Sequence, residues 1–439
     1  MLPSSSRPLR ALDADASARR RATQARAEGR GAADLADLAA AVALDPQAPV
    51  ASGWDGSLPE VELDAAVPAD ASTAAPTEAI AVGQRVTLRR AQPGEAQRVW
   101  RWLVASDLTP RRLGAPLYPD HPPPSFPAFC SDFPAYVFDG SQPYEGRGFI
   151  IRGLAEQRDI GFIAHDRLDV LNDVATLDLW LADSGVAGRG FGSEAITLLC
   201  QWLQKQRGIN RFLLRPSRRN VRALRAMRRA GFRETDLPAP SVIDKLLLPR
   251  GEYADEVLLF RFLSLPPQRL PRADGRCNVF FDSEFTHLLE PQLLSVGAVA
   301  DDGSHFYAEL SEALDVDLNG PLEQRCSEFV QRVVLPLLEG GARPRAQVAA
   351  AFNAWLAQRA EAGPVTLVTD SGFDRWAVAE LLQTEDLPPG VEWLRVPVAY
   401  ETLDETTASL QLRRHHALDD ARALQQAVIE GAIGTLGGR

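Results

Sequence analysis

Two acidic residues follow a short apolar run in the second half of the chain. Residues 279–285 read VFFDSEF, so Asp282 and Glu284 are separated by one position. On a β-strand such residues point to the same face. Neighbouring carboxylates repel each other and are costly to remove from water unless a cation compensates them. The pair therefore indicates either a cation site or the end of a strand whose acids face solvent.

Further acids and two adjacent histidines follow on other predicted elements. Asp370 and Asp374 stand between a buried strand predicted over 364–369 and the start of a helix, and Asp420 stands in a helix predicted from residue 417. If these elements meet at one end of a sheet, the converging carboxylates require divalent cations such as Mg²⁺ or Mn²⁺. Two such cations about 4 Å apart suit in-line displacement at phosphorus. A neutral histidine at the rim can take a proton from the attacking water.

The segments that carry these residues resemble the DEDDh 3′–5′ exonucleases, which have a ribonuclease H-like fold. The resemblance covers roughly residues 277–435 and rests on FFDSEFT (280–286), LLSVGAVADDG (293–303), FYAEL (306–310), GFDRWAV (372–378) and HHALDDA (415–421). Small bacterial exoribonucleases look closest. The resemblance implies a single-stranded nucleic acid as substrate, with the 3′ end of RNA favoured over DNA.

This resemblance also implies a role for individual residues. The general base is His415, because the spacing H-x4-D selects His415 and Asp420 over His416 and Asp419. The implied metal ligands are four carboxylates from different elements: Asp282, Glu284, Asp374 and Asp420.

Two positions in this region leave alternatives open. Asp374 is favoured over Asp370 as a ligand, because Asp374 follows an aromatic residue in the family's F-D pattern and begins a helix. His287 stands where relatives often have glycine, which bears on how the terminal nucleotide is held. The expected elements around these residues are three sequential antiparallel strands (279–285, 292–300, 304–310), helices over 322–339, 344–359 and 373–382, and the strand 364–369.

A glycine-rich segment marks a second candidate site. Residues 187–195 read AGRGFGSEA and precede an apolar helix predicted over 196–206. A turn of this kind exposes backbone N–H groups at the positive end of the helix dipole, where a pyrophosphate can bind. A single G-x-G is also common in tight turns that bind nothing.

The order of elements around this turn resembles the GNAT N-acetyltransferases, particularly the ribosomal-protein N-terminal type, over roughly residues 85–263. The expected strands are 85–89, 148–153, 159–165, 176–181 and 211–215, and a helix over 93–105 should bury Val99 and Leu103. The matching motifs are GRGFGSEA (188–195), RRN (218–220) and AGF (230–232). The resemblance implies acetyl-CoA as cofactor, with its pyrophosphate on the backbone amides of Arg189, Gly190, Phe191, Gly192 and Ser193, and with Asn220 near the pantetheine arm.

The acetyl acceptor, an unknown amine, and the catalytic groups are less defined. Ala187 stands where the family often has glutamine or arginine, and Met227 stands where many members place a tyrosine general acid. Asp178 lies on the strand where some members carry a general base and could deprotonate an amine through water. An exposed strand acid without a catalytic role is the alternative for Asp178.

Four arginines recur at helical spacing from the RRN motif onward. Arg218, Arg222, Arg225 and Arg229 share one face of a predicted helix whose apolar face is Val221, Leu224 and Met227. The pattern is typical of a solvated amphipathic helix. The alternative is an electrostatic contact with RNA or with the 3′-phosphate of CoA.

Length and composition set the outer bounds. A chain of 439 residues predicts two or three domains, and a net charge of −11 argues against a surface that coats nucleic acid generally. Four scattered cysteines without metal-ligand spacing predict reduced thiols and a cytoplasmic location. No apolar run is long enough to span a membrane, and no export signal is expected.

We therefore expect an α/β protein with two α+β or α/β domains. A largely disordered extension over 1–84, with a possible helix over 32–44 after the arginines at 19–21, precedes a mixed-sheet GNAT fold over 85–263. A linker over 264–276 leads to a ribonuclease H-like exonuclease over 277–435. The predicted function is bifunctional. The alternatives are acetyl transfer with an auxiliary nuclease, and a nuclease joined to an inactive GNAT-like binding module.

Overall fold

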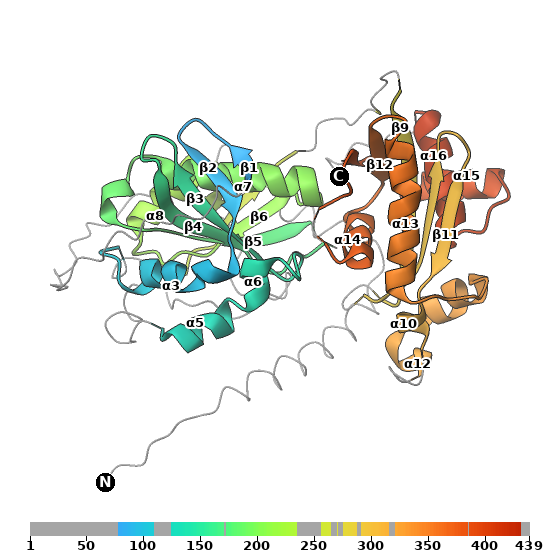
Figure 1. Cartoon of the computed structure of the whole chain (residues 1–439), viewed down its shortest axis with the longest axis horizontal. Helices are drawn as coiled ribbons and strands as arrows, with labels where there is room; N and C mark the ends of the chain where they lie inside the picture. The colour runs from blue at the N-terminus through green and yellow to red at the C-terminus, as the bar shows by residue number, and fades with distance from the viewer. Residues whose placement is uncertain are drawn as a thin grey trace, which may run out of the picture.

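The computed structural model describes residues 78–108, 124–170, 173–234, 256–264, 270, 275–287, 291–315, 321–384 and 386–431. The arginines at 19–21, the helix expected over 32–44 and most of the predicted linker lie outside these ranges. The described residues form a mixed α/β structure with two sheets in two lobes (Figure 1). We call residues 78–264 the N-terminal lobe and residues 275–431 the C-terminal lobe. Within the described part of the chain, every helix is too short or too polar to cross a membrane.

The N-terminal sheet has the strand order β1-β2-β3-β4-β5-β6-β8-β7. Neighbouring strands pair antiparallel except β5 and β6, which are parallel. The bounds are β1 Ala79–Val82, β2 Val86–Arg90, β3 Arg147–Gly153, β4 Arg158–His165, β5 Val174–Leu181, β6 Arg211–Leu214, β7 Arg233–Glu234 and β8 Leu259–Phe262. Strand β1 lies within the segment predicted to be part of the N-terminal extension.

Helices cover both faces of this sheet. On one face, α3 (Ala96–Val104), α5 (Phe126–Asp132) and α6 (Ala135–Asp139) pack on alternate residues of β3, β4 and β5. On the other face, α7 (Phe191–Arg207) and α8 (Val221–Arg229) pack on the residues between them. Short 3₁₀ turns at η1 (Pro93–Glu95) and η2 (Ser184–Val186) precede α3 and α7. Val99 and Leu103 of α3 are buried, as predicted.

The proline- and aromatic-rich segment 110–145 contains two short helices where the structure describes it. From residue 124 onward it forms α5 and α6. Phe129 and Phe138 from these helices are almost completely buried. Their rings lie close to those of Phe133 and Phe162 (centroid separations of 5.0 and 5.9 Å). Burial of these large rings stabilises short helices that their own backbone propensity would not.

The C-terminal sheet has the order β11-β10-β9-β12-β13. The strands are β9 Cys277–Phe285, β10 Leu293–Ala300, β11 His305–Glu309, β12 Val365–Thr369 and β13 Val391–Arg395. The first three form the predicted antiparallel series, and β12 and β13 run parallel to β9. The sequence analysis did not predict β13, whose short pattern VEWLR has no clear alternation of apolar and polar residues.

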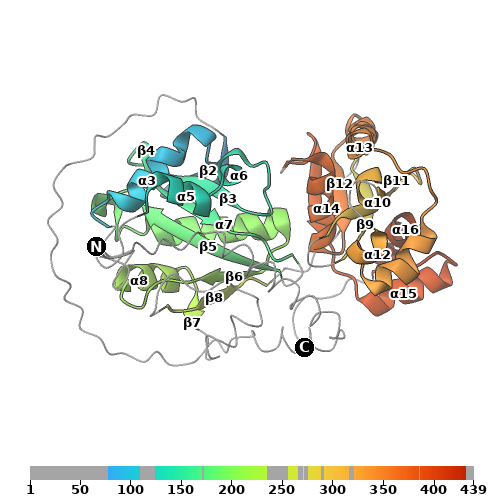
Figure 2. The same ribbon diagram turned by 90° about the horizontal axis from the view of Figure 1, so that it is seen from below.

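Both faces of this sheet are buried, which explains the continuous apolar run that leads to Asp282. Phe281 packs on the side of α13 (Arg345–Ala360) and α14 (Gly372–Leu382). Phe280 packs on the side of α15 (Tyr400–Ser409) and α16 (Ala417–Ile429), and Figure 2 shows these helix pairs around the sheet.

The helix expected over 322–339 is wrong as a single element. The segment contains α12 (Leu322–Arg325), a π-helical turn (Val330–Val334) and a 3₁₀ turn (Leu335–Leu337), and a short α10 (Ser311–Leu314) precedes it. Cys326 has an extended backbone that ends α12. Pro336 lacks the N–H that a continuing α-helix needs. Helix α15 was also not predicted, because most of its residues are polar and its buried face has no apolar pattern in the sequence.

Candidate active sites

Strand β9 places the first acidic pair at the centre of the C-terminal sheet. Asp282 and Glu284 alternate with Ser283 and therefore point to the same face as Phe280, towards α15 and α16. Ser283 points to the opposite face, where its hydroxyl donates to Asp374 Oδ1 (2.8 Å). The carboxyl end of β9 thus contacts both helical layers.

Gly297 allows α16 to approach this strand. It lies opposite Asp282 in the pairing of β10 with β9. A Cβ atom at Gly297 would lie 2.2 Å from the backbone nitrogen of Leu418 and 2.3 Å from the carbonyl carbon of Ala417. No side chain fits there, so the first turn of α16 rests directly on the sheet. That contact brings Asp420, in the same turn, beside Asp282 and Glu284.

The junction of β12 with α14 supplies two more acids. Asp374 is buried in the first turn of α14, where its Oδ2 accepts from the hydroxyl of Ser371 (2.6 Å). Its backbone N–H donates to the same hydroxyl, which caps the helix (3.3 Å). Asp370 lies just before this cap, and both aspartates lie next to Asp282. The structure therefore brings together five carboxylates, one more than the predicted ligand set.

The acids form two adjoining groups. Oxygens of Asp282, Asp370 and Asp374 lie within 4.8 Å of one another, and so do ligand atoms of Glu284, His415 and Asp420. Burial and the neighbouring charges of Asp374, Asp420 and Glu284 raise the pKa of Asp282 well above its usual range. Burial and the charge of Asp420 raise the pKa of Glu284 to about 8. Burial also raises the pKa of Asp420 to about 6 against the opposing charge of Arg414.

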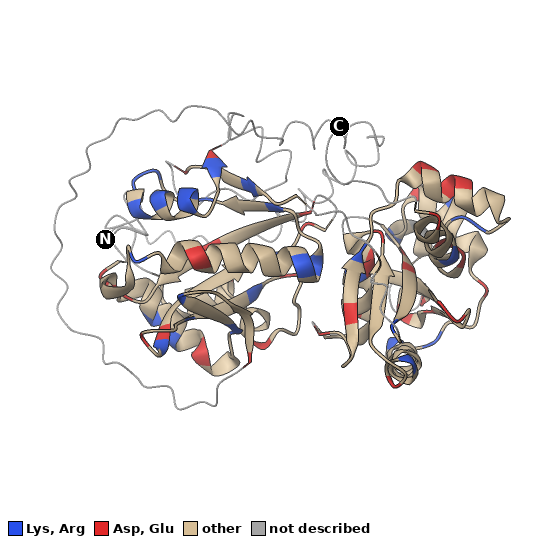
Figure 3. Ribbon diagram, turned by 90° about the horizontal axis from the view of Figure 1, so that it is seen from above, with Lys and Arg blue, Asp and Glu red and all other residues tan. Residues whose placement is uncertain are grey.

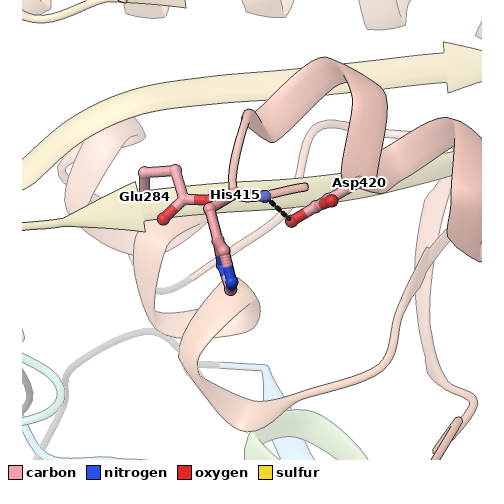
Figure 4. Close-up of side chains that lie close together, drawn as sticks. All are labelled: Glu284, His415 and Asp420. Atoms are coloured by element: carbon pink, nitrogen blue, oxygen red, sulfur yellow. Dashed lines mark hydrogen bonds between the residues drawn. The ribbon is translucent and has the colours of Figure 1, made fainter. Parts of the chain in front are cut away.

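His415 stands at the edge of this acidic site. Its backbone N–H, and not its ring, donates to Asp420 Oδ2 (3.0 Å), as Figure 4 shows. The residue has a left-handed backbone (φ 67°), and a ring nitrogen lies within 4.8 Å of carboxylate oxygens of Glu284 and Asp420. Burial and the charge of Arg414 lower its pKa. The ring is therefore neutral near pH 7 and can accept a proton.

Three residues around His415 were not identified from the sequence. Tyr400 Oη lies 3.2 Å from His415 Nε2, and the ring of Phe329 meets the imidazole edge to face at 4.9 Å. Both aromatic side chains are about half exposed. The guanidinium of Arg414 contacts Asp420 and lies 4.7 Å from the Tyr400 ring centroid. Only Arg414 carried a signal, its position next to His415. Tyr400 belongs to α15, which was not predicted, and Phe329 lies in the segment 322–339, which was expected to form one continuous helix.

The neighbouring His416 and Asp419 belong to a different cluster. The His416 ring is buried and stacks on Tyr307 at 4.6 Å. Asp419 accepts from Arg413 Nε (2.7 Å) and from Arg422 (2.9 Å). These contacts hold the turn before α16 against β11. Within the structure, His415 and Asp420 are the members of HHALDDA that lie with the other acids.

The acidic site fits divalent cations by its donor chemistry. Its oxygen-rich set matches what Mg²⁺ and Mn²⁺ bind. The Oδ1 atom of Asp420 is buried without a hydrogen-bond partner among the described residues. Like charges gathered at such short range are costly without compensation. Arg414 provides part of that compensation, but burial and the neighbouring acids still raise the pKa values of Asp282 and Glu284.

The second candidate site lies at the start of α7. The helix begins at Phe191, earlier than predicted, so Phe191, Gly192 and Ser193 form its first turn. Their N–H groups have no partner within the helix. Gly188 and Gly190 precede them with positive φ values (76° and 89°), and a Cβ at Gly188 would meet nothing within 4 Å. The turn therefore presents backbone donors to open space, as binding of a pyrophosphate requires.

Side chains around this turn are held by neighbouring elements. Arg189 pairs with Glu156 (2.6 Å) and lies over the Phe191 ring at 4.8 Å. Ser193 donates its hydroxyl to the carbonyl of Ala226 in α8 (2.9 Å). Glu194 accepts from the backbone N–H of Arg85 (3.0 Å), which ties β2 to α7. These contacts fix the orientation of the helix start.

Strands β5 and β6 pair over only part of the length of β5. The two strands pair only over Val174–Thr176 and Arg211–Leu213, whereas β5 pairs with β4 as far as Leu181. Because β5 and β6 are parallel, α7 and α8 both begin at the carboxyl edge of the sheet. Asp178 lies on the part of β5 beyond the paired residues and accepts from the N–H of Leu179 (2.9 Å).

The remaining predicted residues of this site have structural contacts. Asn220 caps α8, with its side-chain oxygen accepting from the N–H of Ala223 (3.1 Å). Met227 is buried in the main core of the lobe. Ala187 follows the 3₁₀ turn, and its N–H donates to Ser184 (3.1 Å). The methionine side chain at position 227 has no proton to donate.

The arginine face lies on α8, where Figure 3 shows basic residues gathered. Arg222, Arg225 and Arg229 are exposed, and Leu224 and Met227 are buried as predicted. Arg218 pairs with Glu234 (2.8 Å). In Figures 1 and 2, α8 lies at the end of the molecule opposite α15. A nucleic acid that touched both α8 and the acidic site would have to extend along most of the protein.

Comparison with known proteins found a family model that matches part of the N-terminal lobe. Residues 85–233 match the model described as "Acetyltransferase (GNAT) domain". A search of curated proteins found no match. The similar solved structures include spermidine N-acetyltransferase from Vibrio cholerae, with 15% identity, 40% of this chain and 95% of that chain covered, and a TM-score of 0.30. The aminoglycoside acetyltransferase AAC(6′)-Ib has 17% identity, coverage of 40% and 94%, and a TM-score of 0.30.

Proposed function

We propose that the chain joins a metal-dependent 3′–5′ exonuclease over residues 277–435 to an acetyl-CoA-dependent N-acetyltransferase over residues 85–263. The observation that supports the nuclease is the convergence of five carboxylates and His415 from β9, the β12–α14 junction and the start of α16. Carboxylates held this close together repel one another, and a bound cation would compensate that repulsion. The substrate we propose is a single-stranded nucleic acid, with RNA favoured.

In this proposal each residue has a defined task. Asp282, Glu284, Asp374 and Asp420 would hold two cations, which supply charge stabilisation at the phosphate when bound. His415, neutral because of its lowered pKa, accepts the proton of the attacking water. The bond from the water oxygen to phosphorus forms while the bond to the leaving oxygen breaks. That oxygen takes a proton from solvent.

The family match and the open turn before α7 support the acetyltransferase half. Backbone N–H groups from Arg189 to Ser193 would bind the pyrophosphate of acetyl-CoA, and Asp178 would take a proton from the acceptor amine through water. Burial of Met227, where many family members use tyrosine, favours a second candidate, in which the lobe binds acetyl-CoA or RNA without transfer.

Both halves can be tested on the full-length protein. End-labelled single-stranded RNA and DNA should be shortened from the 3′ end with Mg²⁺ or Mn²⁺, RNA faster than DNA. Full cleavage in EDTA, or internal cuts, would contradict the nuclease. Calorimetric binding of acetyl-CoA together with release of CoA on addition of amines would support transfer. Binding without release would favour the second candidate.

A further inference from the structure

Arg395 occupies the boundary between the two lobes. It ends β13 and lies opposite Thr369, the last residue of β12, in the parallel pairing. Only 12% of its side chain is exposed. Figures 1 and 2 both show α14 and β12 on the side of the C-terminal lobe that faces the N-terminal lobe. The charge of Arg395 is therefore held inside an interface, where it needs partners.

The guanidinium binds both lobes at once. Its Nη1 donates to Asp173 Oδ1 (3.0 Å) and to the carbonyl of Gly208 (3.1 Å), both in the N-terminal lobe. Its Nε donates to the backbone carbonyl of Asp370 (3.2 Å) in the acidic site. The Asp173 side chain is only 13% exposed. Arg395 thus connects a buried carboxylate of one lobe to the main chain of an acid in the other.

The surrounding contacts are close and specific. Gly208 ends α7 with a left-handed backbone (φ 71°), and a Cβ there would lie 2.9 Å from Trp393 Cη2. The Trp393 indole donates to Thr369 Oγ1 (3.0 Å), and that hydroxyl donates to the carbonyl of Ser371 (3.0 Å). The backbone on both sides of Asp370 is therefore fastened to side chains that rest on the end of α7.

We propose that Arg395 is a positioning residue of the acidic site, and that Asp173 and the Gly208 carbonyl of the N-terminal lobe hold it in place. This inference rests on the proposed metal-dependent function. The N-terminal lobe then supports the loop that presents Asp370 and Asp374 to the cations. The same helix, α7, has its start at the candidate acetyl-CoA site and its end at Arg395, so the two sites share a rigid element.

The test uses full-length protein and two variants on either side of the link. Asp173→Asn keeps a residue that tolerates the left-handed backbone at this position (φ 54°) but removes the charge that holds Arg395. Arg395→Gln removes the guanidinium. Supporting residues around metal ligands typically change affinity by about 10- to 100-fold. We expect calorimetric Kd values for Mn²⁺ to rise about tenfold in both variants, and the double variant to lose no more than Arg395→Gln alone.

The matched control is Asp386→Asn. This change breaks a different ion pair between the lobes, Arg90 with Asp386, which lies outside the acidic loop. Its Mn²⁺ affinity should equal that of the wild type. If Asp173→Asn and Arg395→Gln also bind Mn²⁺ within twofold of the wild type, the positioning role is wrong.

A metal-free measurement separates this inference from the proposed function. Backbone amides from residue 370 to residue 374 should exchange with solvent faster in Asp173→Asn than in Asp386→Asn. If the wild type binds no Mn²⁺, the metal site is refuted, while the exchange rates still decide whether Arg395 orders this loop. Equal exchange in the two variants would overturn the inference whatever the metal result.

Discussion

The two candidate sites of this protein are built from different parts of the polypeptide. The acidic site uses side chains from separate elements, and burial together with the charges of neighbouring acids raises the pKa values of Asp282 and Glu284. The turn before α7 uses backbone N–H groups from one continuous segment. Gly188 and Gly190 have positive φ values there, and a Cβ at Gly188 would meet nothing within 4 Å. The acidic site carries an electrostatic cost that a bound cation would offset, whereas the turn needs no such compensation.

This difference predicts how each site responds to mutation. In the acidic site, loss of a side chain should abolish function and relieve strain in the metal-free protein. At the turn, addition of a side chain should abolish binding. The following experiments would sharpen or break that contrast.

The largest effect is expected at the centre of the acidic site. Asp282→Asn should abolish metal-dependent cleavage and weaken Mn²⁺ binding, because Asp282 interacts with all four other carboxylates. Without metal the variant should unfold at the same temperature as the wild type or higher, since one repelling charge is gone. Cleavage assays and calorimetry check both statements. Glu328→Gln, at an exposed ion pair, is the control and should change neither.

A similarly complete loss is expected for acetyl-CoA at the turn. Gly190→Glu places a negative charge where the pyrophosphate would lie, so binding should vanish in calorimetry. Any side chain here also strains a left-handed backbone, at about 1–2 kcal/mol. Gly190→Ala carries that strain without the charge and should keep measurable binding. Unchanged affinity in Gly190→Glu would refute the placement of the cofactor.

Substitutions of the two adjacent histidines should have different effects. His415→Ala should lower the cleavage rate by about 10² to 10⁴ with little loss of stability, because the ring is the proposed general base and lies at an edge of the site. His416→Ala removes a buried ring stacked on Tyr307 and should lower the melting temperature more than the rate of the folded enzyme. Equal rate losses, or a larger one at position 416, would show that His415 is not the base.

Stability of the metal-free protein should depend on pH in a direction that most acids do not produce. The pKa of Glu284 is raised from 4.5 to about 8, so between these values the folded state keeps a proton that the unfolded state has lost. Stability therefore falls as pH rises through this window, and the raised pKa of Asp282 acts with the same sign. Melting temperatures at pH 5.5 and 8 should differ by about 2–4 °C for each kcal/mol lost.

Saturating Mn²⁺ should remove most of this pH dependence, because the cation compensates the ionised carboxylates. Asp282→Asn should reduce it without metal. A metal-free melting temperature that rises steadily from pH 5.5 to pH 8 would contradict the repulsion inferred for the acidic site.

The smallest effect is expected on the arginine face of α8. If this face binds RNA, changing Arg222 and Arg225 to Ser should reduce the log–log salt dependence of RNA binding by about 1.4, from roughly 0.7 for each phosphate contact. Cleavage of saturating substrate should not change. Identical salt slopes for the variant and the wild type would leave α8 as a solvated amphipathic helix.

Much of both sites could be predicted because their chemistry is local in the sequence. Alternation on β9 places Asp282 and Glu284 on one face wherever that strand lies. The glycines at 188 and 190 mark a backbone conformation that other residues avoid. The burial of Val99, Leu103 and Leu224 likewise follows from helical periodicity.

Other features depend on contacts between distant segments, which no local pattern encodes. In the sequence, Gly297 is only one small residue in an apolar strand. Its role becomes apparent from the structure, where α16 rests directly on it. Asp370 joins the acids, Phe329 and Tyr400 flank His415, and Arg395 reaches Asp173 only because separate strands and helices pack together. Side-chain type and spacing thus predicted which residues are candidates for each site. Which side chains meet, how far their pKa values move and how the lobes are linked follow from tertiary packing, because burial and Coulomb interactions depend on distance in space and not on distance along the chain.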